Sequence, residues 1–177
     1  MRLKSIAAHL RPYLMLARRR TTMNHAFAAA IAPSDTYDEG RSREALLVLG
    51  LNPEGELECA YCGEPAETWD HVFATVRNSR FSGYGHRLGN LMPCCKPCNS
   101  RKGNKHWQAH LEALQFSPVR YEQRRDAIER FLATYATIDP PLEQSADQNR
   151  LDEIHKHVLE LLEEGDRVAA RIRSGRT

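Results

Sequence analysis

Apolar residues recur at helical spacing near both ends of the chain, whereas the middle lacks such periodicity. In the first 32 residues, Leu10, Leu14 and Ala17 fall near one face of a helix, and a shorter helical pattern follows before residue 50. From Leu57 to about Trp107 the chain is instead rich in Gly, Pro, Cys and Asn. The pattern predicts helices on both sides of a central segment that has little apolar core of its own.

Three further helical segments are predicted after the central segment. Apolar positions at helical spacing cover residues 107–114 and 121–135. The last segment repeats every seven residues, in two series: Leu151, Val158, Gly165 and Ile172, and Ile154, Leu161 and Val168. Because Gly165 interrupts the apolar seam, packing against the same chain or against a partner protein is favoured over an autonomous coiled coil.

These patterns divide the chain into three parts. Residues 1–52 form an N-terminal helical segment, residues 53–112 a central module, and residues 113–177 a set of C-terminal helices. No stretch has the length and apolarity of a membrane-spanning helix, and the sequence has no secretory signal pattern. We therefore expect a cytoplasmic protein that has no association with a membrane.

Five cysteines have to be explained in a reducing compartment, where structural disulfides are rare. Four of them form two Cys-x₂-Cys pairs, Cys59 with Cys62 and Cys95 with Cys98. Each pair lets a tight turn present two thiolates to one ion, and the two pairs complete the tetrahedron that structural Zn²⁺ prefers. Cys94 is then a spacer that points away from the ion, although a register in which Cys94 is a ligand stays open.

The distribution of charge indicates an anionic partner. The formal net charge is only +2, but no Asp or Glu lies between His71 and Leu111, where there are seven Lys and Arg residues. The rest of the chain carries a net charge of −5. Part of the basic block offsets the negative charge of a four-thiolate zinc site, and the surplus suits a polyanion such as nucleic acid.

Further motifs lie between and beside the cysteine pairs. In chain order they are Asp70-His71, Asn90-Leu91, Asn99 and Lys102-Gly103. With the two cysteine pairs, they resemble the zinc-bearing branch of the HNH endonuclease family over about 50 residues, and the resemblance leaves out the flanking helices. It implies an α+β fold, in which a mostly helical chain surrounds a central ββα-metal finger stapled by zinc.

The resemblance implies a role for each motif residue. His71 is the general base that activates water, and Asp70 with Asn99 holds a catalytic Mg²⁺ or Mn²⁺ ion. Asn90 orients the loop that positions His71. The residue types agree with these roles, because carboxylate and amide oxygens are hard ligands and a neutral imidazole accepts a proton near physiological pH.

The resemblance also implies a function, the hydrolysis of DNA phosphodiester bonds by nicking or double-strand cleavage, in a restriction or phage-defence setting. The basic side chains expected to contact nucleic acid are Arg77, Arg80, Arg101, Lys102 and Lys105. The C-terminal helices are expected to supply packing, DNA docking, or attachment to a larger protein assembly or to a second copy of the chain.

Alternatives stay open at this point. A non-catalytic zinc module that binds nucleic acid or protein has the same cysteine pairs, and RNA is an alternative substrate. His106 and His110 are four residues apart on an expected helix and are compatible with a metal site, but a solvated helix face is the favoured interpretation.

Overall fold

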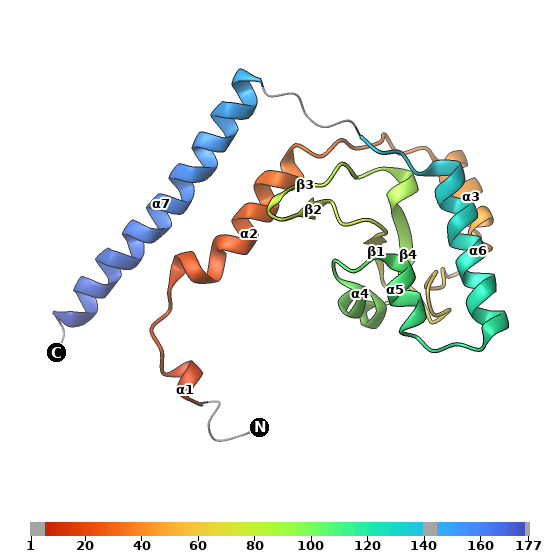
Figure 1. The fold of residues 1–177 in the computed structure, drawn as a ribbon, viewed down its shortest axis with the longest axis horizontal. Helices are drawn as coiled ribbons and strands as arrows, with labels where there is room; N and C mark the ends of the chain where they lie inside the picture. Colours follow the sequence, from red (N-terminus) through yellow and green to blue (C-terminus); the bar gives the residue numbers. More distant parts are fainter. Residues whose placement is uncertain (1–5, 140–144, 176–177) are drawn as a thin grey trace. The chain divides into compact units, whose positions relative to one another are not determined.

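The structure, a computed structural model, describes residues 6–139 and 145–175. Helices dominate and two small antiparallel sheets accompany them, which confirms the expected α+β class (Figure 1). The chain folds as two compact units. One unit consists of residues 28–141, and the other combines residues 1–27 with residues 142–177.

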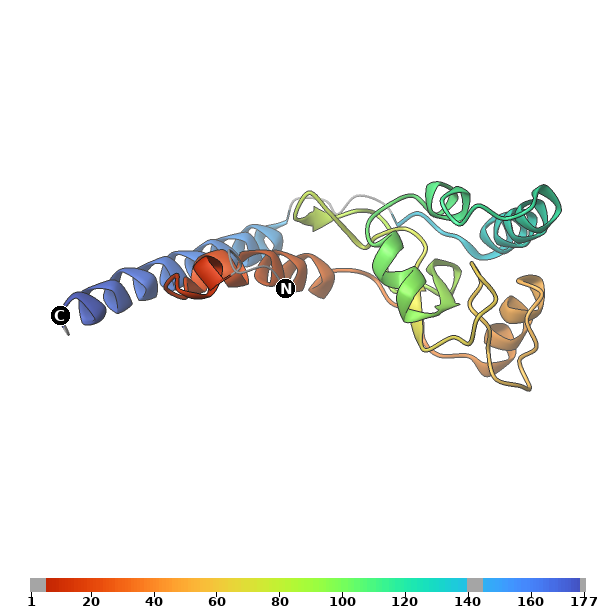
Figure 2. The same cartoon turned by 90° about the horizontal axis from the view of Figure 1, so that it is seen from below.

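The helical unit is built on an antiparallel pair of helices, α2 (Met15–Ala30) and α7 (Ala146–Ser174), which the single turn α1 (Ile6–His9) precedes. α2 lies along α7 in both ribbon views (Figures 1 and 2). Asp166 accepts hydrogen bonds from the backbone N–H groups of Met15 and Leu16, at 2.7 and 3.1 Å. A carboxylate in this position satisfies N–H groups that the first turn of α2 leaves without helical partners.

The seven-residue repeat of α7 has a structural explanation. At Gly165 a Cβ atom would lie 2.7 Å from Cε of Met15, so the glycine makes room for that side chain. The other series of the repeat, with Ile154, Leu161 and Val168, is exposed. In the structure the Gly165 side of α7 faces α2 of the same chain.

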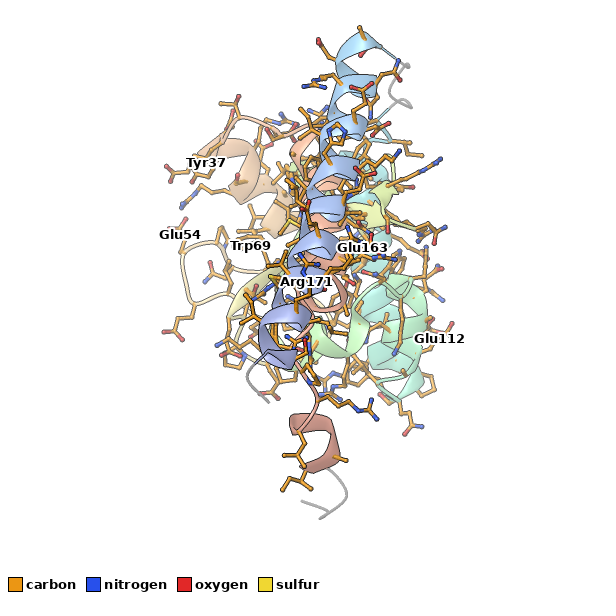
Figure 3. All side chains as sticks on the ribbon, turned by 90° about the vertical axis from the view of Figure 1, so that its left-hand side faces the viewer. Tyr37, Glu54, Trp69, Glu112, Glu163 and Arg171 are labelled. Atoms are coloured by element: carbon orange, nitrogen blue, oxygen red, sulfur yellow. The ribbon has the colours of Figure 1, made fainter. Side chains whose placement is uncertain are left out.

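The surface of α7 that α2 leaves uncovered is charged as well as apolar. Glu163 and Arg171 are among the exposed charged side chains along this helix (Figure 3). Among the described residues, no helix is both long and apolar enough to cross a bilayer.

The second unit centres on a two-stranded sheet that leads into a helix. β1 (Thr68–His71) pairs antiparallel with β4 (Leu91–Cys94), in a register that sets Asp70 opposite Met92 and His71 opposite Leu91. The chain then enters α4 (Lys96–Lys102). Two antiparallel strands followed by a helix give the ββα order that the sequence predicts.

The long connection between β1 and β4 carries a small hairpin. Its strands are β2 (Val76–Arg77) and β3 (Arg80–Phe81), and the 3₁₀ turn η2 (Leu88–Asn90) follows them. The two residues between the strands, Asn78 and Ser79, have φ angles of 52° and 61°. Left-handed backbone at both positions is typical of a two-residue hairpin turn, in which Asn is a favoured residue.

Three more helices complete this unit: α3 (Glu39–Val48), α5 (Trp107–Glu112) and α6 (Pro118–Tyr135). α3 packs against α6 (Figure 1). Their apolar side chains share one buried cluster with the sheet and the cysteines, whose members include Leu49, Tyr61, Met92, Cys98, Leu111, Ile128 and Phe131. The flanking helices therefore supply the apolar core that the central segment lacks.

This arrangement differs from the sequence-based division at residues 52 and 112. Helices α3 and α6, which that division assigned to the flanking parts, belong to the same compact unit as the finger. Residues 1–27 belong instead with α7. Composition marks the ends of the central segment, but it does not show which helices cover that segment.

We expect Phe131→Ala to lower the free energy of unfolding of residues 28–141 by about 3–5 kcal/mol, because Phe131 is fully buried in the shared core. Both tryptophans, Trp69 and Trp107, lie in this unit, so tryptophan fluorescence during urea unfolding reports its stability. Val119→Ala, at an exposed position of the same helix, is the control and should change stability by less than about 0.5 kcal/mol. Equal midpoints for the two variants would exclude α6 from the core.

Candidate functional site

Four thiols converge at one end of the two-stranded sheet. The Sγ atoms of Cys59, Cys62, Cys95 and Cys98 all lie within 4.8 Å of one another, and those of Cys62 and Cys95 are 3.6 Å apart. A tetrahedral ion with Zn–S bonds of about 2.3 Å requires sulfur–sulfur separations of about 3.8 Å. The four residues therefore fit a structural zinc ion, and the expected ligand set is brought together.

Each cysteine pair sits on a turn that the local sequence dictates. In the first pair, Gly63 adopts a φ of +83° and donates its N–H to the carbonyl of Cys59 at 2.9 Å. A residue with a Cβ is strained in that conformation, which explains a glycine directly after the pair. In the second pair, Cys95 is the N-cap of α4 and Cys98 lies in its first turn. An ion held by both pairs ties the loop before β1 to the helix after β4.

Cys94 is buried beside the cluster instead of pointing away from it. Its Sγ lies 3.9 Å from Sγ of Cys59 and 3.4 Å from the carbonyl oxygen of Cys95. Hydrogen bonding to Cys94 is the first of the effects that lower the pKa of Cys59 to about 4, and a low pKa favours the thiolate form that binds zinc. Cys94 thus supports a ligand, and it is not one of the four converging thiols.

Asp70 points into the interior of the finger. It is 4% exposed, and its carboxylate accepts a hydrogen bond from the Tyr61 hydroxyl at 2.9 Å. Nζ of Lys102 lies 3.0 Å from Oδ2 of Asp70, and the same ammonium donates to the carbonyl of His71 at 2.7 Å. Burial and then the charge of Asp70 raise the pKa of Tyr61 well above 10, so the phenol stays protonated as a donor. The negative charge of Asp70 is therefore compensated by the buried ammonium group of Lys102.

His71 faces the other side of β1, because successive residues of a strand point to opposite faces. Its Nε2 lies 2.9 Å from Nδ1 of His86, and the two rings meet at 69°. Burial, and then the neighbouring charge of His86, lower the pKa of His71 from 6.5, while Asp70 opposes this shift. The imidazole is therefore neutral at physiological pH, as a general base must be.

The sequence-based reasoning missed His86. It lies in the segment Gly85-His86-Arg87, four residues before Asn90, and this proximity to a motif residue was the available signal. Its backbone is fixed on both sides. The N–H of His86 donates to Pro33 at 2.7 Å, and its carbonyl accepts from the N–H of Asp35 at 3.2 Å.

Asn90 joins the two ends of the loop between the strands. Its Oδ1 accepts from the N–H of Phe73 at 2.8 Å, and its Nδ2 donates to the carbonyls of Phe73 and Gly85, both at 3.0 Å. Phe73 lies two residues after His71, and Gly85 directly precedes His86. One buried amide thus holds the backbone next to both imidazoles.

The other expected contacts are placed in two different environments. Arg77 and Arg80 are exposed and paired across the β2–β3 hairpin, while Arg101 and Lys105 are exposed at the end of α4. Lys102 is 1% exposed, and it is therefore a buried ion-pair partner in this structure and not a surface contact for phosphate. Neighbouring residues on α4 point to solvent and to the core in turn, so Arg101 is exposed whereas Lys102 is buried. Composition alone does not show this difference.

Asn99 is half-buried on α4.

The interpretation of His106 and His110 as one solvated helix face is right for one of the two residues. His106 is exposed, but His110 is 2% exposed, and its ring meets the edge of Tyr61 with centroids 5.0 Å apart. Nε2 of His110 has no hydrogen-bond partner within the described part of the chain.

The face of the sheet that carries His71 borders a cavity of about 470 Å³. Its walls include Tyr37, Trp69, His86 and Leu91. Trp69 is 49% exposed, and it stands two residues before His71 on the same face of β1. His86, the hydrogen-bond partner of His71, therefore lines this cavity.

The strands, the helix and the thiol cluster define a ββα finger with a four-cysteine metal site and a histidine pair on one face. Residues 59–105 match the family model described as HNH endonuclease. Searches of curated proteins and of solved structures give no match to the chain.

We expect Cys98→Ser to reduce the zinc content from one ion per chain to well below one, because it removes one of the four converging thiols. Cys94→Ser is the matched control and should retain one ion, since Cys94 lies outside that set. Metal analysis of the purified variants after dialysis measures both. Zinc loss from Cys94→Ser together with retention in Cys98→Ser would show that Cys94 is a ligand.

Lys102→Met should lower the free energy of unfolding by about 3–5 kcal/mol, because it leaves the buried Asp70 carboxylate without its counter-charge. Adding Asp70→Asn to that variant should recover part of the loss, since the uncompensated charge is then removed. Lys105→Met, at an exposed position, is the control and should fall within about 0.5 kcal/mol of the wild type. Urea unfolding followed by tryptophan fluorescence provides the measurement, and equal effects at 102 and 105 would argue against the buried ion pair.

Proposed function

We propose that this chain is an endonuclease that hydrolyses phosphodiester bonds in DNA, with His71 as the general base. The single observation that carries the proposal is a neutral imidazole, held at 2.9 Å by a second imidazole, on a zinc-stapled segment that matches the HNH endonuclease family. HNH domains act on nucleic acids, which agrees with the absence of Asp and Glu between His71 and Leu111.

In the proposed reaction His71 takes a proton from a water molecule as that water attacks the phosphorus atom. A bond forms between the water oxygen and phosphorus, and the bond from phosphorus to the 3′ oxygen breaks. The 3′ oxygen takes a proton from solvent, and His71 later returns its own proton to solvent. The products are a 5′-phosphate and a 3′-hydroxyl end.

A divalent cation, Mg²⁺ or Mn²⁺, belongs to the proposal through the oxygen donors of Asp70 and Asn99. Carboxylate and amide oxygens fit the chemistry of such a cation. When bound, it supplies positive charge that stabilises the phosphate and the departing oxygen. Because Asp70 is buried against Lys102, the ammonium must release the carboxylate before a cation binds there.

Binding of the DNA backbone is assigned to the exposed basic side chains. Arg77 and Arg80 extend from a hairpin whose strands are only two residues long, and Arg101 and Lys105 lie close to Asn99 in the sequence. Such side chains bind phosphates without reading the base sequence. A cytoplasmic location is part of the same proposal, because none of the five cysteines forms a disulfide.

One observation favours a second candidate, a non-catalytic zinc module that binds nucleic acid. Both oxygens of Asp70 are already engaged, by Tyr61 and Lys102, so the carboxylate is less open to a cation than in an assembled metal site. Under this alternative, the exposed basic residues bind DNA and no bond is cleaved.

Incubation of the purified protein with supercoiled plasmid and Mg²⁺ should convert the plasmid to relaxed or linear DNA, and EDTA should stop the conversion. We expect His71→Ala to reduce the cleavage rate by about 10²–10⁴-fold, because the general base is lost. Zinc content and tryptophan fluorescence should be retained. His106→Ala removes an exposed imidazole and should cleave at close to the wild-type rate.

DNA binding without cleavage by the wild-type protein would support the non-catalytic module. Unchanged cleavage by His71→Ala would assign the activity to a different site. Parallel incubations with RNA of the same length distinguish the two kinds of nucleic acid.

A further inference from the structure

We infer that His86 is a positioning residue for the proposed reaction, because it sets which nitrogen of His71 is free to accept a proton. Nδ1 of His86 accepts the N–H of His71 Nε2, so Nδ1 of His71 is left as the base. The inference rests on the proposed function for its consequences in catalysis. The hydrogen-bonding pattern that it requires is a property of the folded protein and is testable without substrate.

The number of hydrogen atoms on the two rings limits which nitrogen of His71 can accept a proton. A neutral imidazole has one N–H donor and one acceptor nitrogen. The 2.9 Å contact between Nε2 of His71 and Nδ1 of His86 needs one hydrogen between the two atoms. If that hydrogen belonged to His86, then Nδ1 of His71 would carry the other N–H of its ring, and no acceptor would be free. Only donation by His71 leaves it able to take a proton from water.

The backbone on both sides of His86 holds its imidazole in place. Gly85, which precedes His86, is held on both sides of its backbone. Its N–H donates to Asp139 at 3.3 Å, and its carbonyl accepts from Asn90 at 3.0 Å. The N–H of His86 itself donates to the carbonyl of Pro33 at 2.7 Å. A Cβ atom on Gly85 would lie 2.2 Å from the Pro33 carbonyl oxygen, so only glycine permits this approach. The imidazole of His86 is therefore placed by its backbone before any substrate arrives.

The residue after His86 is fixed as firmly. Arg87 donates to Asp139 at 2.6 Å and to Asp35 at 2.9 Å, and the carbonyl of His86 accepts from the N–H of Asp35. Both neighbours of His86 are thus tied to the Asp139 carboxylate, and Arg87 is also tied to Asp35. This arrangement holds a ring at a defined distance from His71, as required of a group that selects one form of a base.

Nuclear magnetic resonance of ¹⁵N-labelled protein tests the inference directly. Long-range ¹H–¹⁵N correlations of the His71 ring distinguish the Nε2–H form from the Nδ1–H form in the wild-type protein. We expect the Nε2–H form at neutral pH. An Nδ1–H ring for His71 overturns the inference whether or not the protein cleaves DNA, and failure of all cleavage with the Nε2–H form present would count against the proposed function alone.

Two substitutions at His86 extend the test to catalysis. His86→Leu keeps bulk but removes the acceptor, and it should lower the single-turnover cleavage rate by about 10–100-fold while the Kd for DNA stays within about twofold. His86→Asn places an oxygen acceptor close to the position of Nδ1 and should recover most of the rate. His106→Leu, which removes an exposed imidazole, is the matched control.

The same variants separate positioning from a purely structural role. A structural role predicts equal losses for the Leu and Asn variants, together with loss of zinc or of the native tryptophan fluorescence. If His86→Leu lowered DNA affinity and not the cleavage rate, His86 would be a binding residue and the inference would be wrong. If His86→Leu failed to fold, the ring form of His71 in the wild type and the rate of His86→Asn would still decide the question.

Discussion

The convergence of four thiols within 4.8 Å is the constraint on which the rest of the finger depends. Four sulfur ligands at this spacing fit one tetrahedral cation, and binding of such an ion adds directly to the stability of a segment with little core of its own. The two strands of the sheet are four residues each, which is too short for independent stability. An ion bound by all four thiols would link the loop before β1 to the start of α4 and so join the ends of both strands.

The alternation of side chains along β1 then separates two kinds of chemistry. Asp70 faces the interior, where Lys102 and Tyr61 compensate its charge. His71 faces the opposite side, where it meets His86 and where Trp69 borders a cavity. Adjacent residues in one motif are thus assigned to opposite faces by the period of a strand. Burial and the neighbouring His86 lower the pKa of His71, against the opposing effect of Asp70.

The parts of this fold that the sequence predicted are those whose causes are local. Two cysteine pairs, each presenting two thiols from one tight turn, follow from neighbouring residues. Asn90, which was expected to orient this loop, forms hydrogen bonds through its side-chain amide with Phe73 and Gly85. Spacing along the chain is informative where one residue and its contacts lie in the same short segment.

The parts that were missed depend on contacts between distant segments. His86 is held by Pro33, and its neighbour Arg87 is held by Asp35 and Asp139, each about 50 residues away along the chain. No local sequence pattern predicts such contacts. Lys102 looked like a surface cation because it lies in a basic run, whereas helix geometry turns it into the core beside Asp70. The helices α3 and α6 were assigned to the flanks for a similar reason, since an apolar face does not state what it covers.

The loop between the strands combines ends held by hydrogen bonds with a hairpin that carries exposed arginines. Near its ends, Asn90, Asp139 and Asp35 bind the backbone beside His71 and His86. At its tip, the two-residue strands of the hairpin carry exposed arginines. Chemistry needs atoms held to a fraction of an ångström, whereas phosphate binding tolerates movement of long side chains. The hydrogen bonds of Asn90, Asp139 and Asp35 thus lie beside the two imidazoles of the proposed proton transfer, and the exposed arginines lie on the hairpin.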